Sequence, residues 1–310
     1  MDIFEIKAFV NTCESGSQRA SKMLGRSEID VCLAIEKLQS FVAVDLFSDN
    51  LAPSKDTLTD SGRIYYGHAK IFLENLRQCV LDVLRNYENT LEGVPRIKIS
   101  MCSLIGKEIL ADSLSSLSHN FDLSNVCIDL STSDDVVSKY PLKYHAIFGD
   151  PVLTHKDFFQ IRWSANVTQG LYASENYIRD VGMPRSVDDL INHSIIMYGN
   201  SFRDVCKSKG NWYLSKLPEI NPAIIVNNLV ALFAAINADL GIGSSFCYRS
   251  KHLRKVLPEI SGPVVTINFA VRVNIPDKLM YYINAVDKAV RDKLQATGIE
   301  LKIIGENDYV

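Results

Sequence analysis

A long amphipathic stretch in the first third of the chain constrains the fold most. It starts at Thr59-Asp60-Ser61-Gly62 and stops around Glu92-Gly93-Val94-Pro95, where glycine and the residue before proline both disfavour helix. Its apolar residues recur at helical spacing, at Tyr66, Ala69, Phe72, Leu73, Leu76, Val80, Val83, Leu84 and Tyr87. Because this stripe has nothing of its own to cover it, we predict a long helix that pairs with a second subunit.

The segment before this helix has the pattern of three short helices. Apolar residues recur every three or four positions from Ile3 to Cys13, a second helical stretch runs to Leu24, and Gly25-Arg26 makes a turn. Ser27, followed three residues later by Asp30, resembles the capping box of a third helix. We predict two strands of a β-wing at 42–47 and 57–59, around a polar tip at 48–50.

The segment after the long helix alternates between apolar strands and helices, as expected for a mostly parallel sheet. The predicted strands are 97–101, 126–130, 145–148, 169–173, 194–198, 223–226, 241–244 and 265–273. The predicted helices are 105–117, one from about 176, 229–238 and 277–294. This order fits two α/β lobes joined by crossing strands, with a cleft between them.

Composition limits the function classes. The chain has 310 residues, 33 basic against 36 acidic, so any contact with DNA must be local. We find no secretory leader and no apolar run of about 18 residues, and we expect a soluble, cytoplasmic protein. The seven cysteines are scattered and are interpreted as mostly reduced, buried thiols. The histidines have no ligand spacing and no catalytic or nucleotide-binding motif is present, so we expect no metal, no cofactor and no enzymatic activity.

A set of positions in the first sixty residues resembles the LysR-type family of transcriptional regulators. These positions are Phe9-Val10, Glu14, Gly16-Ser17, Ala20-Ser21, Leu24, Ser27, Val31, Ile35, Leu38, Leu46-Phe47, Leu58-Thr59 and Gly62. The resemblance implies an α+β fold: a winged helix-turn-helix at 1–59, a linker and dimerisation helix at 60–92 and a two-lobed, periplasmic-binding-protein-like effector domain at 93–310. Lobe I would comprise about 93–163 and 268–310, and lobe II about 164–267.

The resemblance also implies a function: a homodimer or homotetramer that binds promoter DNA and responds to a small-molecule effector between the lobes. The candidate DNA-binding residues are Arg19, Lys22, Arg26, Ser27, Glu28, Asp30 and Lys37. The cations can equally be solvated surface residues, and of these Arg26 and Lys22 are the predicted phosphate contacts. For Ser27 the alternative is a helix cap, and for Glu28 and Asp30 it is stabilisation of the helix dipole.

The start of the third helix departs from the family pattern. The family usually has Ser-Gln-Pro-Ala-Val-Ser, whereas this chain has Ser27-Glu-Ile-Asp-Val-Cys32. Residues 1–58 hold six basic and nine acidic residues, so we expect weak DNA binding or binding only as an oligomer. A carboxylate can nevertheless accept from cytosine N4. The alternative is a divergent member that has lost specific DNA reading and acts as a small-molecule-binding or protein-interaction partner; a solute-binding receptor is disfavoured by the attached helix-turn-helix.

The resemblance places the effector against residues that follow the first and third strands and that open the second lobe. These are Cys102, Ser103, Asp150, Tyr198, Asn200, Asn228 and Ser244. Ligands of open α/β sheets lie at the carboxyl ends of strands, so the positions are physically reasonable. Each can equally be a cap or turn residue, and Cys102 and Cys206 can be structural thiols rather than redox sensors.

Overall fold

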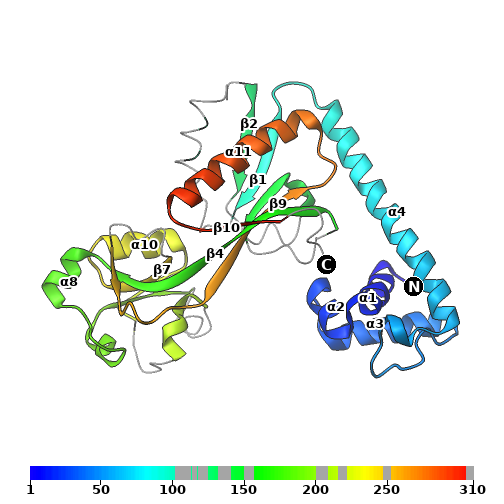
Figure 1. The fold of residues 1–310 in the computed structure, drawn as a ribbon, viewed down its shortest axis with the longest axis horizontal. Coiled ribbons are helices and arrows are strands. Elements are labelled where there is room, and N and C mark those ends of the chain that lie inside the picture. The colour runs from blue at the N-terminus through cyan, green and yellow to red at the C-terminus, as the bar shows by residue number, and fades with distance from the viewer. Residues whose placement is uncertain are drawn as a thin grey trace. The chain divides into compact units, whose positions relative to one another are not determined.

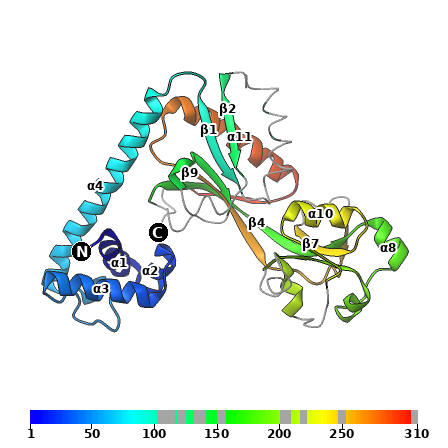
Figure 2. The same cartoon turned by 180° about the vertical axis from the view of Figure 1, so that it is seen from behind.

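The computed structural model describes residues 1–101, 113, 117, 125–131, 141–149, 157–199, 209–215, 222–246 and 253–304. The chain forms two compact units (Figures 1 and 2). Unit 1 comprises Met1–Glu92, Val152–Gln160 and Arg272–Pro276, and unit 2 comprises Gly93–Pro151, Ile161–Val271 and Asp277–Val310. Within the described ranges, no helix combines the length and the apolar character needed to cross a bilayer.

Three helices at the N-terminus pack around one small core: α1 (Ile3–Ser15), α2 (Ser17–Leu24) and α3 (Glu28–Val42). They form the blue cluster in Figure 1. Phe9, Val31 and Leu38 are fully buried and come from α1 and α3. Gly16 joins α1 to α2 with a φ of 76°, a conformation that glycine adopts without steric cost. The predicted helix, helix, turn, helix order is confirmed.

The wing contains less strand than the sequence pattern predicted. A single antiparallel bridge joins Phe47 to Leu58, and a short 3-10 helix, η1 (Lys55–Thr57), precedes Leu58. Val42 is the last residue of α3 and packs against the core, and Ala43 ends the helix in the left-handed conformation. The strand prediction for 42–47 was therefore wrong at its start, because Val42 continues the helical apolar face of Leu38 rather than a strand alternation.

The predicted long helix is α4 (Asp60–Thr90), which Thr59 caps through a hydrogen bond from the Gly62 amide to Thr59 Oγ1 of 2.9 Å. Its first half packs against the small core through Ala69 and Leu73. Large apolar side chains on other faces and further along the helix are exposed in this chain, namely Ile64, Ile71, Phe72, Val83 and Tyr87. The expectation that nothing in the chain covers the stripe was therefore wrong for Tyr66, Ala69 and Leu73, whereas Phe72, Val83 and Tyr87 of the stripe are exposed.

Unit 2 is built on a sheet with the strand order β2-β1-β3-β9-β4-β7-β5-β6, with β8 and β10 also paired to β4. The strands are β1 (Arg96–Met101), β2 (Cys127–Ser131), β3 (Ala146–Gly149), β4 (Phe159–Ala173), β5 (Ile195–Tyr198), β6 (Ile224–Val226), β7 (Ile242–Phe246), β8 (Arg254–Val256), β9 (Val264–Arg272) and β10 (Leu301–Ile303). In lobe I, β1 is parallel to β2 and β3, and in lobe II, β5 is parallel to β6 and β7. The long strands β4 and β9 cross between the lobes, as predicted.

The helices of unit 2 are α8 (Glu175–Val181), α10 (Leu229–Asn237) and α11 (Asp277–Ala296), with 3-10 turns η3 (Pro141–Lys143), η5 (Asp188–Asn192) and η6 (Lys209–Ser215). Figure 2 shows α11 beside β1 and β2, and α10 beside β7. Trp163 Nε1 donates a 2.5 Å hydrogen bond to the Asp287 carboxylate and so ties β4 to α11. The helix predicted at 105–117 lies outside the described residues, apart from Ser113 and Leu117.

The cysteines differ from the expectation of buried thiols. Cys13 is buried, and desolvation raises the pKa of its thiol to about 12. Cys79 and Cys127 are exposed, so the expectation was wrong for these two. Cys79 lies on an exposed face of α4 and Cys127 is the first residue of β2. The apolar pattern did not reveal which side of either element faces the core.

Candidate DNA-binding face and candidate effector site

The start of α3 is fixed by a reciprocal capping box. The Asp30 amide donates to Ser27 Oγ at 3.1 Å, and Asp30 Oδ2 accepts from the Ser27 amide at 3.2 Å and from Ser27 Oγ at 2.8 Å. These hydrogen bonds, with a smaller contribution from the Arg26 charge, hold the pKa of Asp30 below its usual value. The capping role predicted from the Ser27–Asp30 spacing is confirmed.

Replacing Ser27 by alanine should lower the free energy of unfolding by about 1 kcal/mol, the usual cost of losing an N-cap. Because the folded pKa of Asp30 is lowered, its ionised form stabilises the cap above the ordinary carboxyl pKa, and this contribution disappears as the pH falls through the lowered value. Urea unfolding at neutral and acid pH measures both effects. Ser40→Ala, whose hydroxyl bonds within α3 to Glu36 O, is the control, and an equal loss in both variants would refute the capping argument.

The outer face of α3 combines an acidic row and an apolar row. Burial raises the pKa of Cys32, and the charges of Glu28 and Glu36 raise it further, which places the two carboxylates on either side of this thiol. Glu28 Oε1 also accepts a 2.5 Å hydrogen bond from Ser17 Oγ at the start of α2. Next to this row, the side chains of Ile29 and Leu33 are 71% and 47% exposed.

All seven candidate DNA-binding residues are exposed. Arg19 and Lys22 lie on α2, Arg26 lies in the turn before α3, and Lys37 lies in the middle of α3. The structure therefore gathers the candidates on α2, the turn and α3, while Ser27, Glu28 and Asp30 also have local structural roles.

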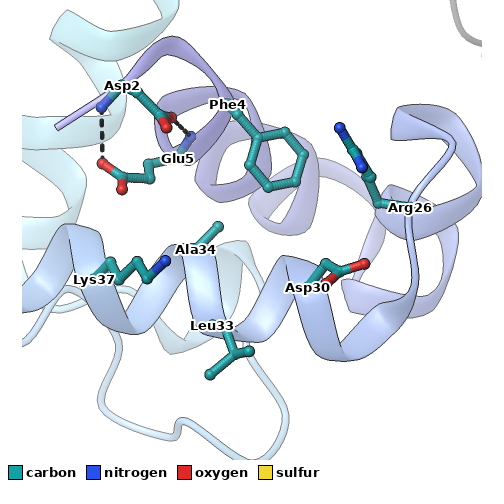
Figure 3. A pocket seen from close by; sticks show the side chains of 8 residues that line it. All are labelled: Asp2, Phe4, Glu5, Arg26, Asp30, Leu33, Ala34 and Lys37. Carbon is teal, nitrogen blue, oxygen red and sulfur yellow. Dashed lines mark hydrogen bonds between the residues drawn. The ribbon is translucent and has the colours of Figure 1, made fainter.

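A small pocket of about 190 Å³ opens between the first turn of α1 and α3 (Figure 3). Its lining residues are Asp2, Phe4, Glu5, Arg26, Asp30, Leu33, Ala34 and Lys37. Arg26 packs over the Phe4 ring, 5.8 Å from its centroid. Asp2 and Glu5 cap α1 by accepting hydrogen bonds from each other's backbone amides, both of 2.8 Å. Three carboxylates against two cations leave this pocket without a net positive charge.

Three of the candidate effector residues are described, and all belong to lobe II. Tyr198 ends β5, and its backbone exchanges hydrogen bonds of 3.0 and 2.7 Å with the Asn211 side chain. Ser244 lies in β7, the parallel neighbour of β5, and its hydroxyl accepts a 3.2 Å hydrogen bond from Trp212 Nε1. Asn228 is the N-cap of α10 and accepts from the Ala231 amide at 2.7 Å, which is its alternative role. Cys102, Ser103, Asp150 and Asn200 lie outside the described residues.

The sequence reading missed residues that the fold brings to these positions. Asn211 and Trp212 come from η6 and contact the end of β5 and the middle of β7, although neither shares a motif with those strands. Ser100 in β1 is buried, and its hydroxyl has no hydrogen-bond partner within the described part of the chain. A polar residue at the buried end of an apolar strand is the one signal that could have identified Ser100.

No protein-family model matches the chain. Among solved structures, the LysR-type transcriptional regulator CrgA from Neisseria meningitidis superposes with a TM-score of 0.51 at 17% identity, over 93% of this chain and 98% of CrgA. The chain has the LysR-type fold. The regulatory domain of CrgA alone gives a TM-score of 0.50 at 14% identity, over 64% of this chain and 99% of that domain. The LysR-type fold confirms the predicted fold class, with its N-terminal helix-turn-helix and two-lobed α/β domain.

Proposed function

We propose that this protein is a LysR-type transcriptional regulator that binds promoter DNA through α2 and α3 as a homo-oligomer in the cytoplasm. The observation that carries the proposal is a capped, outward-facing third helix in a helix-turn-helix, which residues 43–59 join to the long helix α4. Effector binding in the two-lobed domain would change DNA binding by favouring one of two arrangements of the oligomer.

Phosphate contacts supply most of the affinity of such proteins for DNA. Arg19, Lys22, Arg26 and Lys37 are the exposed cations on the proposed face, and they lie beside Glu28 and Glu36. Each carboxylate repels the phosphates, so we expect modest affinity with a steep dependence on salt.

The second part of the proposal concerns assembly. The exposed apolar residues of α4, among them Phe72, Val83 and Tyr87, support pairing with the same helix of a second copy. Two binding heads on one assembly compensate for weak contacts by each head. A dimer or a tetramer therefore fits the charge of the proposed DNA-binding face better than a monomer does.

The test is a salt series of binding by the full-length chain to its own upstream intergenic DNA, with a scrambled duplex of the same composition as control. We expect binding that prefers the upstream DNA and weakens steeply between low and physiological salt. Absence of binding to either duplex at low salt would refute the proposal and favour a partner-binding role.

Glu28→Gln should strengthen nonspecific DNA binding at low salt by about threefold, because it removes a negative charge from the surface that approaches the DNA while keeping the side-chain shape. Glu259→Gln, an exposed carboxylate of unit 2 that is not part of the helix-turn-helix, is the matched control. Titration of a fluorescent scrambled duplex measures the change. Equal affinities for Glu28→Gln and the unmodified chain would mean that Glu28 does not face DNA.

For the effector, we propose that a small molecule binds lobe II beside Tyr198, Ser244 and Trp212.

Gly262 approaches the indole of Trp212 so closely that a Cβ on residue 262 would lie 2.4 Å from the ring. Gly262→Ala should therefore displace the indole, break its hydrogen bond to Ser244 and cost about 1–3 kcal/mol. A red shift of tryptophan fluorescence reports the displacement. Ser244→Ala removes the acceptor without pushing the ring, so a shift as large in this variant would contradict the steric argument.

A further inference from the structure

The outer face of α3, which the proposed function places against DNA, carries two exposed apolar side chains. The inference drawn from these two residues rests on the proposed function. Ile29 and Leu33 lie one helical turn apart and are 71% and 47% exposed. Val31 and Ile35 on the opposite side of the helix are buried in the core of the three-helix cluster. In Figure 3, Leu33 points away from α1, whereas Ala34 points toward it. The two faces of α3 are therefore distinct, and Ile29 and Leu33 belong to the outer one.

The polar neighbours of this pair are already engaged. Asp30 is turned back onto Ser27 by the capping box, and one oxygen of Glu28 accepts from Ser17. Isolated exposed apolar residues are ordinary on protein surfaces. Ile29 and Leu33, however, are neighbours at the start of α3. The proposed function places this part of the helix in a major groove, where the two side chains would contact the edges of base pairs.

The major groove offers one prominent apolar group, the C5 methyl of thymine. Guanine presents only acceptors there, and adenine presents an acceptor beside its amino group. An acceptor that faces Ile29, Leu33 or the Glu28 carboxylate would lose its water without gaining a partner. Glu28 can accept only from an amino group, such as N4 of cytosine.

We propose that Ile29 and Leu33 read thymine methyl groups in the operator, with Glu28 facing a base-pair edge that presents an amino group. The half-site that this protein selects then contains thymine at the positions opposite the apolar pair, and cytosine or adenine, the bases that present an amino group, opposite Glu28. Arg26, in the turn before α3, and Lys37, within α3, flank the pair and supply the phosphate contacts on either side. The four exposed cations of α2, the turn and α3 favour a nucleic acid over a protein as the occupant of this face.

The test compares two duplexes of the upstream DNA, one natural and one in which every thymine of the protected half-site is replaced by uracil. The replacement removes only the methyl groups and keeps base pairing. Loss of one buried methyl contact weakens binding by about fourfold, so two contacts predict about fifteenfold tighter binding of the thymine duplex. The unmodified full-length chain is used, so this result does not depend on the folding of any variant.

A second comparison assigns the effect to residues. Ile29→Ala with Leu33→Ala should bind the two duplexes with nearly equal affinity, whereas Ile191→Ala with Val264→Ala, two exposed apolar residues of unit 2, should keep the full thymine preference. Equal binding of the two duplexes by the unmodified chain would overturn the inference while leaving the proposed function intact, and would assign the apolar pair to a protein partner. No binding to any duplex would overturn the proposed function and this inference with it.

Discussion

Replacing Arg272 by methionine is expected to lower the free energy of unfolding by about 3–5 kcal/mol. The Arg272 guanidinium donates to the Glu88 carboxylate, and the two side chains are only 2% and 8% exposed. Methionine fills similar space but withdraws the guanidinium from the buried Glu88 carboxylate, and removing one charge of a buried pair is the costly way to break it. Chemical denaturation at a fixed protein concentration measures the loss, since oligomerisation makes apparent stability depend on concentration.

Two further variants distinguish the cost of breaking a buried ion pair from the cost of removing any arginine. Arg85→Met removes an exposed arginine that bonds to Asn274 at 2.9 Å near the same end of α4, and should cost less than about 1 kcal/mol. Glu88→Gln combined with Arg272→Met removes both charges and should recover a large part of the loss. If Arg272→Met costs no more than Arg85→Met, the buried pair does not stabilise the protein.

Gly62→Ala should destabilise the N-terminal cluster by about 3 kcal/mol, at the upper end of the usual cost of overpacking. A Cβ at position 62 would lie 2.0 Å from the carbonyl oxygen of Leu46, and backbone cannot move aside as a flexible side chain can. Leu46 and Leu58 are buried around this contact, so the first turn of α4 would have to separate from the core. Loss of cooperative unfolding, or a lower midpoint followed by circular dichroism, measures the effect.

Gly67→Ala, in the same helix, is the matched control because a Cβ there meets nothing within 4 Å. An alanine in an exposed helix interior should raise stability by up to about 1 kcal/mol. The two substitutions are chemically identical and should have opposite signs. A shared sign would mean that helix propensity rather than the contact with Leu46 decides the outcome.

Periodicity and capping chemistry predicted much of this fold. The long helix was predicted from Thr59 to about Glu92 and is observed at Asp60–Thr90, because a threonine cap and a glycine-proline end act locally. The Ser27–Asp30 capping box was predicted for the same reason. An apolar repeat at helical spacing was also sufficient to predict α1, α3 and α11.

Features that depend on distant partners were not predictable in this way. The strands β8 and β10 have three residues each and are held by their pairing with β4. Segments this short carry no clear strand pattern of their own, so neither was predicted. The first half of β4 was missed because its polar residues, such as Arg162 and Ser164, interrupt the apolar run. At the candidate effector site, Trp212 contacts Ser244 across thirty-two positions of sequence, and only packing brings the two together.

The crossing of β4 and β9 has a consequence for synthesis on the ribosome, where the chain emerges from its N-terminus. Lobe II runs from the second half of β4 to the start of β9 and is therefore continuous in the sequence, so it emerges before the rest of β9. Lobe I waits for the end of the chain: Phe269 of β9 stacks on Phe148 at 4.3 Å, and Leu301 of β10 pairs with Ala165. The domain that is begun first is thus finished last, and until then the fully buried β1 and β3 side chains Ile99 and Phe148 lack their native cover.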